Sequence, residues 1–196
     1  STGIVLGVTS TPDKIPKEIL KEITANYRII SKDEVPSDVK VHWVDSWEEL
    51  YKILKAPLKV RRIHENQVRT NAYVIPTPEG KIISIPIYEG ALLIYAGPET
   101  LYNDSLVAPL ELVGEYYVDV DEGIITSINA DDIAQTYLPF WRVKSSSCNK
   151  GPTGVSTSWA SAVATFEYFL GIDPIGIVVQ TRTLRVSETL RVPRSK

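Results

Sequence analysis

The order in which apolar segments, helical patterns and turn signals follow one another restricts the fold of this chain more than any other feature. Before residue 65, apolar runs predict strands and two amphipathic stretches predict helices, one of them opened by the capping-box pair Ser46 and Glu49. The expected strands are residues 4–8, 27–30 and 39–44, and the expected helices are residues 15–23 and 46–54. A strand–helix–strand–strand–helix order with short links is typical of an α/β layer that contains parallel strands.

The remainder of the chain carries a different pattern. Apolar runs on both sides of Thr77-Pro78-Glu79-Gly80 predict a β-hairpin, and further strands are expected at residues 91–95, 110–113, 124–125 and 175–179. Residues 145–154 are polar and contain glycine, which predicts a loop. From Val155 to Leu170, apolar residues recur at helical spacing and predict a helix that ends at Gly171.

These patterns together predict a Rossmann-like α/β fold, with a mixed sheet flanked by helices and an added β-hairpin in the middle of the chain. We expect one domain over residues 1–196, because this length is typical of a single domain and no linker composition interrupts it. Within it, residues 1–65 would form a nucleotide-binding-like half. Residues 66–196 would form a strand-rich half with an Asp-x-Asp motif and a C-terminal helix.

Composition narrows the classes of function. A net charge of −3 and a pI of about 5.5 argue against a nucleic-acid binder, and the single cysteine, Cys148, excludes an internal disulfide or a cysteine-cluster metal site. No apolar run reaches the roughly 20 residues that span a bilayer, so we expect a cytoplasmic protein without a transmembrane segment. The lack of methionine and the presence of only three glutamines are typical of proteins from thermophiles.

The most distinctive motif is the run Gly114-Glu115-Tyr116-Tyr117-Val118-Asp119-Val120-Asp121. Two carboxylates near the end of a hydrophobic strand, with a glycine close by that permits a turn, can hold a divalent cation against the phosphates of a substrate. The alternative is that Asp-Glu-Gly forms an ordinary hairpin turn between two strands. Spacing alone leaves both interpretations open.

A second candidate group follows two of the predicted strands. Asp45 comes directly after the third strand, and Thr9 follows the first. In open α/β sheets, ligands bind at the carboxyl ends of strands, so Asp45 would accept a hydrogen bond from a ribose hydroxyl or a base N–H, with Thr9 lining the same crevice. Alternatively both are turn residues, since Ser46 opens a helix beside Asp45.

Three segments together resemble the nucleotide-sugar-dependent glycosyltransferases of the GT-A type. They are Val8-Thr9-Ser10-Thr11-Pro12, Trp43-Val44-Asp45-Ser46 and the Gly-Glu-Tyr run into Asp-x-Asp. The resemblance implies that Asp45 contacts the nucleoside and that Asp119 and Asp121 bind Mn²⁺ or Mg²⁺ and the ribose-diphosphate. It also implies a downstream general base, for which Glu167 is the first candidate and Asp131 and Asp132 are the alternatives. The implied reaction moves a sugar from a nucleoside diphosphate sugar to a hydroxyl acceptor.

Two other functions stay open. The chain also fits a non-enzymatic α/β protein that acts by interaction or assembly, for which exposed tyrosines would form a patch: Tyr88, Tyr95, Tyr102, Tyr116 and Tyr117. It fits a different nucleotide-handling enzyme with the same strand-end acids as well. Geometry separates these hypotheses, because convergence of Asp45, Asp119 and Asp121 in one crevice would favour an enzyme, whereas an exposed hairpin at Asp119 and Asp121 would not.

Overall fold

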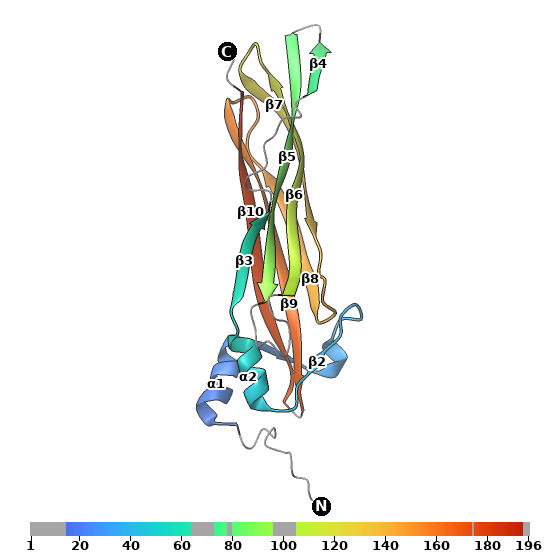
Figure 1. The fold of residues 1–196 in the computed structure, drawn as a ribbon, viewed down its shortest axis with the longest axis vertical. Helices are drawn as coiled ribbons and strands as arrows, with labels where there is room; N and C mark the ends of the chain where they lie inside the picture. Colours follow the sequence, from blue (N-terminus) through green and yellow to red (C-terminus); the bar gives the residue numbers. More distant parts are fainter. Residues whose placement is uncertain (1–14, 64–72, 78–79, 96–104, 174, 194–196) are drawn as a thin grey trace, which may run out of the picture.

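Long antiparallel strands make up most of the molecule and run along its long axis (Figure 1). The computed structural model describes residues 15–63, 73–77, 80–95, 105–173 and 175–193. The longest described strands have 16 residues, which corresponds to about 50 Å of extended chain. Two helices and two short strands lie together at one end, which we call the foot (Figure 1). The fold is therefore a tall β-sandwich that stands on a partly helical foot.

One sheet, sheet I, contains β1 (Arg28–Ile30), β10 (Gly176–Arg191), β9 (Thr157–Ile172), β8 (Trp141–Lys150) and β2 (His42–Trp43). β10 pairs antiparallel with β9 along its whole length, and β8 borders the other side of β9. β1 borders β10 only at the foot, opposite residues 177–179. Among the described strands, β2 alone pairs in parallel, with two residues of β9.

The other sheet, sheet II, contains β3 (Leu58–Ile63), β4 (Tyr73–Thr77), β5 (Gly80–Tyr95), β6 (Ser105–Asp119) and β7 (Ile124–Ala134). β5, β6 and β7 follow one another as an antiparallel meander. On the free side of β5, β4 pairs with residues 80–84 and β3 pairs with residues 90–95. β10 packs over β5 and β6, and β9 packs over β6 and β7, so the two sheets lie face to face.

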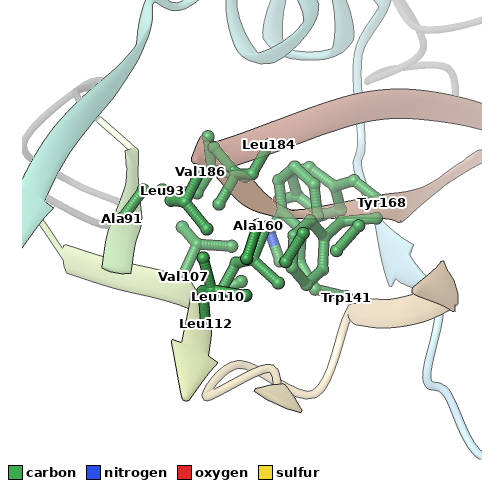
Figure 2. Packing of buried hydrophobic residues seen from close by; sticks show 14 of the residues in the cluster. Ala91, Leu93, Val107, Leu110, Leu112, Trp141, Ala160, Tyr168, Leu184 and Val186 are labelled. Atoms are coloured by element: carbon green, nitrogen blue, oxygen red, sulfur yellow. The ribbon is translucent and has the colours of Figure 1, made fainter. Parts of the chain in front are cut away.

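The inner faces of the two sheets share one hydrophobic core. Figure 2 shows members of it from sheet II (Ala91, Leu93, Val107, Leu110 and Leu112) and from sheet I (Trp141, Ala160, Tyr168, Leu184 and Val186). Along β9 the inner positions change from Ala160, Ala162 and Ala164 to Phe166 and Tyr168 toward the foot. The alanines leave room for the larger aliphatic side chains that face them, and the rings fill the space near the foot.

The foot closes the lower end of this core. It contains α1 (Lys17–Asn26), a 3-10 turn η3 (Lys32–Glu34) and α2 (Trp47–Lys55), whose Leu50, Ile53 and Leu54 are buried. Gln180 of β10 donates from Nε2 to the carbonyl oxygen of Leu54 at 3.2 Å, which ties α2 to sheet I. None of the described helices is long and apolar enough to cross a membrane.

The predicted Rossmann-like α/β fold is wrong, because the structure is two antiparallel sheets with two described α-helices, and neither helix flanks a parallel sheet. Residues 155–170, predicted as the C-terminal helix, belong mainly to β9. Near the foot both faces of β9 are buried: Phe166 and Leu170 face the main core, whereas Phe169 packs on the outer face with Ile30 and Ile177. Apolar residues on both faces remove the alternation that indicates a strand and imitate helical spacing.

Two further expectations need correction. The polar segment 145–154, predicted as a loop, contributes residues up to Lys150 to β8, whose seryl side chains are exposed. The division at residue 65 does not separate two halves of the sheet structure, because β1 and β2 pair with β10 and β9.

The locally encoded elements are confirmed. α1, β1 and the β4–β5 hairpin lie where the sequence predicts them. α2 begins after Ser46, whose Oγ accepts a hydrogen bond from the Glu49 N–H at 3.2 Å.

Candidate functional site

The Asp-x-Asp sequence lies in the turn between β6 and β7. Oδ1 of Asp119 accepts hydrogen bonds from the backbone N–H groups of Asp121 and Glu122, both at 3.0 Å. Gly123 has a φ of 67°, a left-handed conformation that reverses the chain, and its N–H donates to the carbonyl oxygen of Asp119. Asp119 therefore caps the turn, as the hairpin interpretation of this sequence predicted.

The described residues around this turn form no recognisable metal centre. Asp121 is exposed, and the described part of the chain holds no group of three or more His, Cys, Asp or Glu side chains arranged to bind an ion. The binding of Mn²⁺ or Mg²⁺ by Asp119 and Asp121 stays a prediction.

Asp45 lies far from that turn. It is exposed in the connection between β2 and α2 at the foot, whereas the β6–β7 turn is at the opposite end of the molecule (Figure 1). The Asp45 N–H donates to the Glu49 carboxylate at 3.4 Å, so Asp45 belongs to the start of α2. Thr9 lies outside the described residues. The structure therefore does not bring Asp45 together with Asp119 and Asp121.

Glu167, the predicted general base, is a buried member of an ion-pair network. Its carboxylate lies 2.7 Å from Nη2 of Arg28 and 3.5 Å from Nη1 of Arg142, and its side chain is 2% exposed. Arg142 also lies 3.6 Å from Asp38. Because Arg28 is on β1 and Arg142 is on β8, this carboxylate connects two strands across sheet I. Its catalytic role stays a prediction.

A cluster around His42 was not expected from the sequence. Nδ1 of His42 lies 2.7 Å from the hydroxyl of Tyr168, and its ring stacks on Phe140 at a centroid distance of 4.7 Å. Burial lowers the pKa of His42 below its ordinary value of 6.5. Tyr168 in turn stacks on Trp141, so the cluster joins β2, β8 and β9. In the sequence, His42 is a lone histidine among apolar strand residues, which gives no signal of its contacts with β8 and β9.

One long side of the sandwich is closed by the backbone. After β7, the N–H of Tyr137 donates to Val107 of β6, and then the carbonyl oxygen of Phe140 accepts from Phe169 of β9, so residues 135–141 cross from sheet II to sheet I. Toward the other end, Ile125 of β7 exchanges hydrogen bonds with residues 154 and 155. We call this side, where β7 and β8 meet, the closed edge.

The opposite side is open over the described residues. β10 pairs with β1 only at residues 177–179, and no described strand pairs with its outer edge at residues 181–191. In sheet II, residues 85–89 of β5 likewise have no described partner between β4 and β3. Because β10 packs over β5 and β6, sheet II extends beyond β10 by one strand, which is β4 beside residues 80–84 of β5 and β3 beside residues 90–95. We call this side, bounded by β10 and β3, the open edge.

An apolar residue is uncovered at the open edge. Val60 of β3 pairs with Leu93, which is buried in the core, so Val60 belongs to the inner face of sheet II. Its side chain is nevertheless 57% exposed, since sheet I ends at β10. On the same inner face, Arg62 lies 3.4 Å from Glu89, whose side chain is 12% exposed. A strand added beside β10 would therefore lie over apolar surface at Val60, next to an ion pair.

Three of the five tyrosines of the predicted patch have described side chains, and they differ in exposure; Tyr117 is half-buried and donates to Glu115 at 3.4 Å. Tyr116 is buried and donates to the carbonyl oxygen of Arg191 at 2.9 Å, whereas Tyr88 is 39% exposed and donates to Glu111. Tyr102 and the side chain of Tyr95 lie outside what the structure describes.

No family model, no curated protein and no solved structure matches this chain.

Proposed function

We propose that this protein is a non-enzymatic assembly subunit whose copies associate by adding a strand to the open edge. One observation carries the proposal: the outer edge of β10 presents eleven consecutive residues, 181–191, without a described partner strand. An unpaired edge offers a row of backbone donors and acceptors to an extended segment of another chain. The exposed Val60 beside it adds apolar surface that a new strand would cover.

The glycosyltransferase hypothesis has less support. Its described residues lie in three separate places: Asp45 is at the foot, Asp119 and Asp121 are at the turn at the opposite end, and Glu167 is paired with arginines inside sheet I. Transfer of a sugar from a nucleoside diphosphate sugar therefore stays a prediction. The expected cytoplasmic location stays a prediction as well.

Sedimentation velocity of the full chain, combined with amide hydrogen exchange, tests the assembly function. We expect species larger than the monomer that grow with concentration. In them, the amides of residues 181–191 that point away from β9 should exchange more slowly. The amides of β7 at the closed edge serve as the internal control, because their exchange should not depend on association. A chain that stays monomeric at every concentration, or association without protection of residues 181–191, would contradict the proposal.

A further inference from the structure

We propose that the strand added to the open edge consists of residues 2–9 of a second copy of this chain. This inference rests on the assembly function proposed above and names the segment that performs it. Three properties of the open edge select this occupant: its length, the apolar surface beside it and its charge.

The length of the segment fits the edge. Eight extended residues span about 26 Å, and the eleven residues 181–191 of β10 span about 36 Å, so the segment pairs without overhanging either end. β1 already occupies residues 177–179 of this edge with an antiparallel strand. The added strand continues sheet I along the same side of β10.

The side-chain pattern of the segment fits the surface beside β10. Ile4, Leu6 and Val8 alternate along it and share one face of an extended chain. That face is strongly apolar, and it covers Val60 on the inner face of β3. Val5 and Gly7 then lie on the outer face, level with the exposed threonyl side chains of β10.

Charge argues against the simplest competitor, in which the β10 edges of two copies pair with each other. The edge exposes Arg182, Arg185 and Arg191, with Glu188 as the only acid in β10. Two such strands side by side would bring like charges together, which destabilises a strand pair. Residues 1–12 contain no charged side chain, so they meet these arginines without repulsion.

The positions of the two partners allow exchange between copies, and the open edge extends from residue 181, just above the foot, to the opposite end. α1 begins at the foot, whereas β10 ends at the opposite end of the molecule (Figure 1). Copies arranged end to end would therefore present the segment of one to the open edge of the next. Such a head-to-tail contact uses two different surfaces and can repeat without closing, which builds a filament.

Four full-length variants test the inference by sedimentation velocity. Leu6→Asp places a charge on the inserted face, and Val60→Glu places one on the surface that receives it. Each should weaken association at least about tenfold, because a carboxylate would replace an apolar side chain in the contact and would lose its water there. The matched controls are Val5→Asp, on the outer face of the segment, and Arg61→Glu, on the other face of β3. Both should associate within about twofold of the wild type.

A mixture separates insertion between copies from insertion within one copy. Leu6→Asp retains an intact open edge and Val60→Glu retains an intact segment, so the two variants together should form dimers at concentrations at which each alone is monomeric. Absence of dimers in the mixture would mean that the segment occupies its own chain, and would overturn the inference. Association of Leu6→Asp at the wild-type level would overturn it too, while the assembly function would stand. A wild type that never associates would overturn the assembly function itself.

Discussion

The closed and open edges of the sandwich differ in whether backbone hydrogen bonds and side chains connect the two sheets there. At the closed edge, residues 135–141 cross between the sheets and form backbone hydrogen bonds with both, and an aromatic cluster fills the space behind them. At the open edge, no described hydrogen bond between backbone groups joins residues 181–191 to sheet II, and Val60 remains exposed. The comparison teaches that one hydrophobic core can support both a closed edge and an edge that is free to bind another strand. The core is already complete without a strand added beside β10.

The largest expected difference between the edges concerns their apolar side chains. Trp141→Ala at the closed edge removes a side chain that is 2% exposed and stacked on Tyr168, and should lower the free energy of unfolding by about 3–5 kcal/mol. Val60→Ala at the open edge should cost less than about 0.5 kcal/mol in the monomer. Urea unfolding at concentrations below association measures both.

Trp141→Phe is the matched control for the tryptophan. It keeps an aromatic ring at this position but removes a buried Nε1–H that has no hydrogen-bond partner. It should therefore lower the free energy of unfolding clearly less than Trp141→Ala does. Equal losses at Trp141 and Val60 would contradict the distinction between the edges.

A pair of glycines extends the comparison to the strands of sheet II. Gly114 of β6 has a φ of 141°, and a Cβ there would overlap the carbonyl oxygen of Asn129 in β7. Gly114→Ala should therefore cost on the order of 3 kcal/mol, since backbone would have to move at the closed side. Gly90→Ala meets mainly the side chain of Ile63 in β3, which can shift, and should cost about 1 kcal/mol. Thermal unfolding ranks the two variants, and the reverse order would show that β3 is held more rigidly than β7.

The smallest effects concern the turn that leads into β7. Asp119→Ala removes the acceptor of two backbone N–H groups and should lower the free energy of unfolding by about 1 kcal/mol, whereas Asp121→Ala should stay within about 0.5 kcal/mol of the wild type. Urea unfolding measures both changes.

Isothermal titration of the same variants with UDP or GDP and Mn²⁺ tests the metal-site hypothesis separately. Metal-dependent nucleotide binding that both substitutions abolish would restore the metal-site hypothesis for this turn.

The elements that the sequence predicts correctly depend on neighbours in the chain. α2 follows from Ser46 and Glu49, three residues apart, and the β6–β7 turn follows from Asp119 and the nearby Gly123. Both signals work through hydrogen bonds within a few residues, so a single sequence contains them. The turn that the alternative interpretation of Asp-x-Asp predicts is present, while metal binding by Asp119 and Asp121 stays a prediction.

The open edge could not be predicted, because it depends on which distant strands lie beside β10. The charges of Arg182 and Arg185 indicate exposed side chains, which the structure has, but they give no information about the edge of the sheet. Likewise, the small inner residues of β9, such as Ala162, are good helix formers and conceal a strand. Long-range pairing overrides such local preferences.

The continuous pairing of β9 and β10 has a mechanical consequence. β10 starts at the foot and ends at the opposite end, paired with β9 from residue 176 to residue 191, and its hydrogen bonds are perpendicular to the strands. A pulling force along the long axis would load these bonds in shear, so that they share the tension and must break together. Subunits joined end to end along this axis would form a thread whose tensile strength comes from its own longest strands.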